Sequence, residues 1–222
     1  MQKTRTTFAP FAGALALAGV LFVLYPALRP FSSEVGLEGA RAFASSRWVV
    51  AHSLGIFAFV LLGIGTLGLY LRLRETGVGA GSLTALLLMW LGVALTLPYY
   101  GAEVFGLHAV GQRVLAQDEP RAMKPLAHAI RFEAGIFFIV IGLVLVAVGA
   151  ILLARATWRS GMLNRWSGVP LAVGLVLYLP QFGGGQSLRV VHGMLMLAGC
   201  AWLARELATS ERTNLSTVTV PS

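Results

Sequence analysis

The sequence has little charge. Of its 222 residues, 12% are charged, whereas 57% are hydrophobic and the mean hydropathy is +0.77. A soluble domain usually has a charged share of about 25%. The sequence has too few polar side chains to cover the surface of a compact, water-soluble fold of this length. The composition therefore excludes a soluble globular protein and predicts an integral membrane protein whose main partner is the lipid bilayer.

Cysteine and several catalytic motifs are also scarce or missing. The single cysteine, Cys200, excludes an intrachain disulfide and the metal or redox motifs built on paired cysteines. The sequence contains no GxSxG nucleophile motif, phosphate-binding P-loop, dinucleotide fingerprint or HExxH zinc motif. Acyl transfer and ATP-driven chemistry therefore have no support in the sequence.

Long apolar runs dominate what is present. They predict an all-α integral membrane protein with six transmembrane helices in a single domain, residues 1–208. The polar, Thr- and Ser-rich tail that follows, residues 209–222, is expected to be disordered. Pro170 and Pro180 flank the body of the fifth run, which favours a tight or partly re-entrant hairpin there. The six runs are Phe8–Leu28, Trp48–Leu71, Leu83–Phe105, Ile130–Leu153, Trp166–Leu179 and Leu188–Leu203.

Basic residues are in excess, with 17 Lys and Arg against 9 Asp and Glu. They lie in short segments between the apolar runs, where such residues anchor helix ends at a membrane surface, so no nucleic-acid partner is expected. Six spans place both termini on one side. Lys3, Arg5, Arg72, Arg74 and Arg155 lie close to helix ends on that side, which favours a multi-pass protein of the cell membrane with cytoplasmic termini.

A weak internal repeat and many glycines accompany these runs. A shift of 80 residues aligns Gly55-Ile56-Phe57 with Gly135-Ile136-Phe137, which favours three helical hairpins in the same orientation. Apolar helices also match one another by chance, so a bundle without an internal repeat is the alternative.

The sequence contains 26 glycines, and Gly142 and Gly149 share one face of the fourth run, as expected for close helix packing.

Ionisable residues gather on the membrane face opposite the termini. His52 and His192 each lie about one helical turn inside a predicted span, Glu103 follows Pro98, and Glu133 lies just inside the fourth span. Ionisable groups at such depth are costly, and they face the bundle interior, a water-filled cavity or one another. The sequence therefore predicts a ligand-binding cavity formed by His52, Glu103, His128, Arg131, Glu133, Arg189 and His192.

Imidazole and carboxylate groups suit several kinds of site. A neutral imidazole is both a metal ligand and a base near pH 7, so a divalent metal, a haem iron or a proton relay fits these residue types. Glu103 and His108 are five positions apart, about 140° of helical rotation, so a site needs residues from several helices. A structural network is the alternative, with Glu103 and Glu133 paired to arginines and with His108 and His128 outside it.

Three functions fit this pattern. We favour a non-enzymatic module for small-molecule binding, sensing or transport, with a polar cavity at the face opposite the termini. An outer-face metal- or haem-dependent membrane enzyme is the second, and it needs at least two of His52, His128 and His192 in one ligand shell. A structural or assembly subunit of a membrane complex is the third. A homo-oligomer is compatible with each.

The residues assign neither an enzymatic activity nor a cofactor, but they do provide a test. If Glu103 pairs with Arg131 across adjacent helices and no void adjoins the pair, the cavity hypothesis fails.

Overall fold

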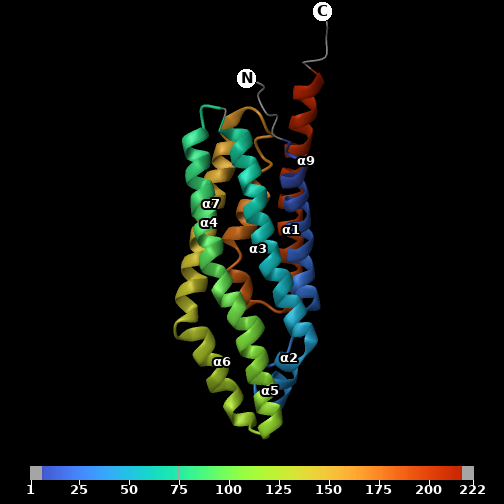
Figure 1. Ribbon diagram of the computed structural model, residues 1–222, viewed down its shortest axis with the longest axis vertical. Helices are drawn as coiled ribbons and strands as arrows, with labels where there is room; N and C mark the ends of the chain where they lie inside the picture. The colour runs from blue at the N-terminus through green and yellow to red at the C-terminus, as the bar shows by residue number, and fades with distance from the viewer. Residues whose placement is uncertain (1–6, 75, 217–222) are drawn as a thin grey trace, which may run out of the picture.

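The computed structural model describes residues 7–74 and 76–216, and every secondary-structure element in this part of the chain is a helix (Figure 1). The all-α prediction is therefore confirmed. The elements are α1 Ala9–Leu28, α2 Gly36–Ala44, α3 Ser46–Leu73, α4 Gly79–Gly101, η1 Ala102–Gly106, α5 Leu107–Gln117, η2 Pro120–Ala122, α6 Met123–Phe132, α7 Gly135–Ser160, α8 Val169–Val176, η3 Pro180–Gly183 and α9 Gln186–Ser216.

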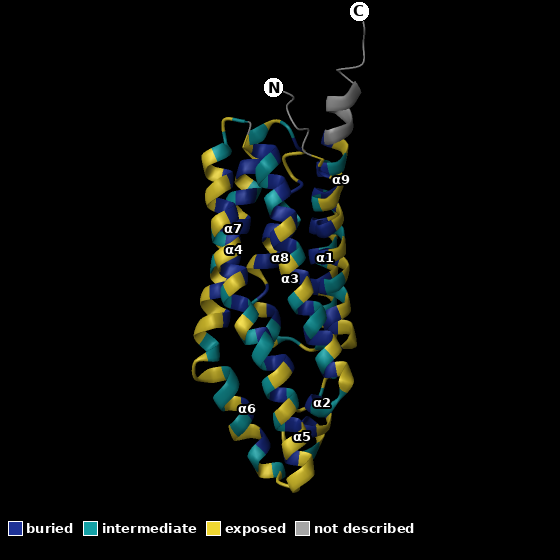
Figure 2. Ribbon diagram, in the orientation of Figure 1, coloured by how far each residue is buried: buried dark blue, intermediate teal, exposed yellow. Residues whose placement is uncertain are grey.

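Five helical segments of the described chain are long and apolar enough to cross a membrane. Their exposed side chains are largely apolar, as Leu87, Ile141 and Met194 illustrate, and exposed positions run along the outer surface of the bundle (Figure 2). Extended exposed apolar surface suits contact with lipid. The five segments are Ala9–Leu28, Ser46–Leu73, Gly79–Gln117, Gly135–Ser160 and Gln186–Ser210.

The prediction of six spans is not confirmed. The run Trp166–Leu179 contains only the eight-residue helix α8, which is followed by turns and the short η3. Pro170 lies at the start of α8 and Pro180 at the start of η3. Proline is tolerated at a helix start but interrupts a longer helix because it lacks the N–H donor. The three-hairpin repeat is not confirmed either, since the third pair joins the short α8 to the long α9.

Glycine brings two of the membrane helices into close contact. Helix α4 packs along α7 (Figure 1), and a Cβ atom added to Gly142 of α7 would lie 2.5 Å from Thr96 Oγ1 and 2.9 Å from the Gly92 carbonyl oxygen. A Cβ atom on Gly149 would lie 2.9 Å from the Ala85 carbonyl oxygen. Both glycines thus face α4, and the two backbones approach as they do in small-residue membrane interfaces.

Helices α2, α5 and α6, with η2, form a cap at the end of the molecule opposite the termini (Figure 1). We call these elements the helical cap. The continuous segment Gly79–Gln117 has 39 residues and is therefore about 58 Å long, nearly twice the hydrocarbon thickness of a bilayer. Its α5 portion must project beyond the bilayer. The cap shares a small core with the start of α3, formed by Ala40, Phe43, Trp48, Leu107, Val114, Met123 and Ala127.

The start of α1 and the end of α9 lie at the same end of the molecule (Figure 1). The side of the membrane on which they lie stays a prediction. Helix α9 continues to Ser216, past Thr209, where the polar tail was predicted to begin. Thr209 Oγ1 donates a hydrogen bond to the Arg205 carbonyl oxygen at 2.9 Å, so a hydroxyl side chain is accommodated within the helix. Residues 217–222 lie outside the described residues, and the division into a domain and a tail stays a prediction.

We predict that Gly142→Ala destabilises the protein by about 1–3 kcal/mol, because the new methyl group overlaps Thr96 and the α4 backbone. Gly13→Ala is the matched control, since no atom lies within 4 Å of a Cβ atom placed there. Thermal unfolding of both variants in detergent measures the difference. Equal unfolding temperatures for Gly142→Ala and wild type would contradict the close α4–α7 contact.

Candidate functional site

A cavity of about 530 Å³ lies where the membrane helices meet the helical cap. Its walls come from the end of α1 and the loop after it, from α3, from α4 with η1, from α6 with α7, and from the η3 region with α9. The segments are far apart in the sequence, so the cavity exists only in the folded protein. The ionisable groups in its wall, tyrosines aside, are Arg29, Glu34, His52, Glu103, Arg131 and Arg189.

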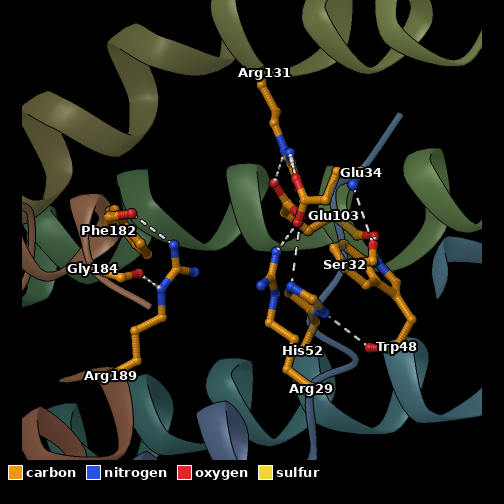
Figure 3. Close-up of polar contacts among 10 residues, drawn as sticks. All are labelled: Arg29, Ser32, Glu34, Trp48, His52, Glu103, Arg131, Phe182, Gly184 and Arg189. Atoms are coloured by element: carbon orange, nitrogen blue, oxygen red, sulfur yellow. Dashed lines mark hydrogen bonds and ion pairs between the residues drawn. The ribbon is translucent and has the colours of Figure 1, made fainter. Parts of the chain in front are cut away.

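Glu103 forms the centre of the ionic contacts. It lies in η1, a π-helical turn that follows Pro98 of α4, and its side chain is buried. A π turn changes the direction of the side chains in it, and such turns recur at functional sites. Arg131 Nε donates to Glu103 Oε1 at 2.6 Å, and Arg131 Nη2 donates to Oε2 at 2.9 Å (Figure 3). This two-bond geometry is the strong form of an arginine–carboxylate pair.

Arg131 also reaches a second carboxylate. Its Nη1 donates to one oxygen of Glu34, and the other oxygen of Glu34 pairs with Arg29 (Figure 3). Glu34 adopts a left-handed backbone conformation with φ of 55° in the loop that joins α1 to α2. Arg29, Glu34, Arg131 and Glu103 thus alternate in charge, and we call them the ion-pair network.

The network keeps Arg131 charged. Burial alone would lower the pKa of the Arg131 guanidinium, but the carboxylates of Glu103 and Glu34 outweigh it and raise the pKa above its ordinary value. The cation therefore persists at every physiological pH. A buried charge is costly unless it is paired and hydrogen-bonded, and here both conditions are met.

His52 and Trp48 hold Glu103 from the α3 side. Trp48 Nε1 donates to the Glu103 carbonyl oxygen at 2.7 Å, and the Trp48 ring packs against His52 with centroids 4.2 Å apart. His52 Nδ1 lies 2.9 Å from the Trp48 carbonyl oxygen, which can only accept, so Nδ1 carries a hydrogen. Nε2, which carries no hydrogen in the neutral ring, then lies 3.5 Å from Glu103 Oε2.

Arg189 and His192 lie on the α9 side of the site. Arg189 Nε donates to the Gly184 carbonyl oxygen at 3.1 Å, and Nη2 donates to the Phe182 carbonyl oxygen at 2.6 Å (Figure 3). His192 does not line the cavity; it borders a small adjacent void, and its Nε2 donates to the Gly174 carbonyl oxygen at 2.7 Å. The structure thus places Arg189, and not His192, on the cavity wall.

Three further predicted or considered residues lie away from the cavity. His128 is exposed on α6 and stacks on Phe132, and His108 of α5 bonds the Phe43 carbonyl oxygen of the cap at 2.8 Å. The prediction that Glu133 lies just inside the fourth span is wrong, because the helix is interrupted there and Glu133 is exposed between α6 and α7. Gly135 permits this interruption, since a Cβ atom there would lie 2.4 Å from the Ile130 carbonyl oxygen.

The histidines do not assemble into one ligand shell. Within residues 7–74 and 76–216, no group of three or more His, Cys, Asp or Glu residues is placed to hold a metal ion. His52 bonds the Trp48 carbonyl oxygen of its own helix α3, His192 of α9 bonds the Gly174 carbonyl oxygen of α8, and His128 lies on the cap. The second hypothesis, a metal or haem enzyme, therefore gains no support from the described residues.

Sequence reasoning identified His52, Glu103, Arg131 and Arg189 among the cavity residues but missed Arg29 and Glu34. Both missed residues follow the first apolar run directly, at the face where the other ionisable groups gather. A charged residue just after a span, on a face that already holds buried charge, is the sequence signal that could have identified Arg29 and Glu34.

Comparisons with known proteins assign no function. No protein-family model matches the chain, and neither a curated protein nor a solved structure shows significant similarity to it. The site's own geometry is therefore the basis for inference.

We predict that Arg131→Met destabilises the protein by about 3–5 kcal/mol, because Glu103 and Glu34 are left without the cation they share. Arg121→Met, at an exposed position near the start of the same cap segment, should leave the unfolding temperature unchanged. Thermal unfolding in detergent measures both variants. Adding Glu103→Gln to Arg131→Met should recover part of the loss, and full additivity of the two changes would contradict their direct pairing.

Proposed function

We propose that this protein is a membrane-embedded module that binds a small molecule in the cavity between its membrane helices and its helical cap, for sensing or transport. One observation carries the proposal: the Glu103–Arg131 pair borders a cavity of about 530 Å³ instead of a closed contact. A salt-bridged structural cap needs the ion pair but has no need of the space beside it.

The dimensions and lining of the cavity fit this role. Small-molecule sites are concave, of roughly 300–1,000 Å³, and combine apolar walls with a few convergent polar groups. Here Ile136, Ile139 and Leu179 supply apolar wall, and the arginines and glutamates supply the polar groups. The apolar wall can therefore bury the body of a ligand while the polar groups fix its orientation.

The polar groups are also held in place before any ligand arrives. Arg131 is fixed by three hydrogen bonds to two carboxylates, and Arg189 by two backbone carbonyls. Side chains already locked by such contacts lose little conformational entropy on binding, which favours affinity. We also expect the junction of bundle and cap to lie near the membrane surface, where ligands arrive from water or from lipid.

A thermal-shift screen with a cavity-filling variant tests the proposal. Wild-type protein in detergent is screened against organic acids, amines and neutral metabolites, alongside Ile136→Trp, whose larger side chain occupies the cavity. A ligand present at a hundred times its Kd stabilises the folded state by about 2.7 kcal/mol. We expect at least one compound class to raise the unfolding temperature of wild type and to have no effect on Ile136→Trp.

Val140→Trp is the matched control, because Val140 lies one turn further along α7 with an exposed side chain and does not line the cavity. It should respond to the same compounds as wild type. If no compound stabilises wild type, or if the same compounds stabilise Ile136→Trp equally, the cavity is not a binding site and the structural-subunit alternative is favoured.

A further inference from the structure

Arg189 is the one arginine of the cavity wall that has no carboxylate partner among the described residues. The arginine ion pairs of the described cavity join Arg29 and Arg131 to Glu34 and Glu103. With His52 neutral, three guanidinium groups face two carboxylates in the cavity wall. The lining therefore has an excess of one positive charge, located at Arg189.

The contacts of Arg189 orient it without neutralising it. The carbonyl oxygens of Phe182 and Gly184 accept from Nη2 and Nε, and no hydrogen bond in the described structure uses Nη1. Backbone carbonyls carry partial charge only, so the cation keeps its full charge beside the membrane helices. An unneutralised cation near low-dielectric surroundings is costly, which favours uptake of an anion.

Arg29 adds a second guanidinium to the same wall. It is buried, and its Nε has no hydrogen-bond partner. The ring of Phe31 lies close to both cations, with its centroid 5.8 Å from Arg29 Cζ and 5.3 Å from Arg189 Cζ. Figure 3 shows both guanidinium groups extending from the same side of the site, opposite Arg131. An anion between Arg29 and Arg189 would relieve their mutual repulsion.

Part of the wall is apolar. Ile136 and Ile139 of α7 and Leu179, just before η3, line the cavity, and the exposed ring of Phe132 lies at the junction of α6 and α7. A small inorganic anion would leave this surface in contact with water. A ligand with a hydrocarbon body covers it and gains about 25 cal/mol for each Å² of apolar surface removed from water.

We propose that the cavity binds a monoanionic amphiphile, with its negative head group at Arg189 and Arg29 and its hydrocarbon body on Ile136, Ile139 and Leu179. The inference rests on the proposed binding function and specifies the ligand class. A single head-group charge matches the single excess positive charge. Two sources share this chemistry, a single-chain carboxylate such as a fatty acid and an anionic membrane phospholipid.

Equilibrium binding of radiolabelled decanoate tests the proposal, with the protein in nanodiscs of zwitterionic phosphatidylcholine. We expect saturable decanoate binding, and affinities for decanol and decylamine that are lower by about tenfold or more, the typical effect of losing one charge-assisted hydrogen bond. This ligand comparison uses the wild-type protein alone, so it does not depend on the folding of any variant.

Arg189→Gln should weaken decanoate binding by about tenfold or more, whereas Arg205→Gln, an exposed arginine at the other end of the same helix, should leave it unchanged. If phosphatidylglycerol competes with decanoate, the anion site is supported and the natural ligand is a membrane lipid. If decanoate binds but phosphatidylglycerol does not compete, the natural ligand is a single-chain acid. Equal affinity for decanol, full competition by acetate at equal concentration, or unchanged decanoate affinity in Arg189→Gln overturns the proposal. If decanoate does not bind, but amines or neutral compounds stabilise wild type and not Ile136→Trp, the proposed anionic ligand class is wrong and the proposed binding function stands.

Discussion

Charged side chains that are buried are costly unless they are paired and hydrogen-bonded, and this constraint organises the end of the molecule opposite the termini. Arg131 of the cap meets Glu103 of η1 and Glu34 of the loop after α1, and Glu34 meets Arg29. One arginine thus connects three segments of the chain. The helical cap is attached to the membrane bundle through these contacts, and the cavity, with the unpaired Arg189 in its wall, lies beside them.

Local irregularities of the backbone make this pairing geometrically possible. The π turn of η1 directs Glu103 inward, where an uninterrupted α-helix would give the side chain another direction. The left-handed conformation of Glu34 lets its carboxylate reach two arginines. Trp48 and His52 complete the arrangement through hydrogen bonds to backbone carbonyls. The π turn of η1 and the left-handed Glu34 both contribute to this one site, and such irregularities recur at functional sites.

The membrane class, the long spans and the polar character of one end could be predicted from the sequence, because apolar runs and buried ionisable residues are local signals. The pairing of Glu34 with Arg131 joins residues 97 positions apart and has no local signature. The small core around Leu107 and Met123 could not be predicted either, because charged residues surround both positions in the sequence. The position of Glu133 could not be predicted, since the helix break at Glu133-Ala134 is not visible in an apolar run.

A water-accessible cavity beside the apolar helix α7 is the feature on which the proposed binding depends, and thiol accessibility tests for it. In a Cys200→Ala background, Ile139→Cys places a thiol on the cavity wall and Val140→Cys places one on the outer surface of the same helix. We predict that the membrane-impermeant reagent sulfonatoethyl methanethiosulfonate modifies Ile139→Cys, that decanoate slows this reaction, and that Val140→Cys in lipid stays unmodified. If the Ile139→Cys thiol reacts only after the protein unfolds, Ile139 lies in a packed core and the cavity beside α7 does not exist.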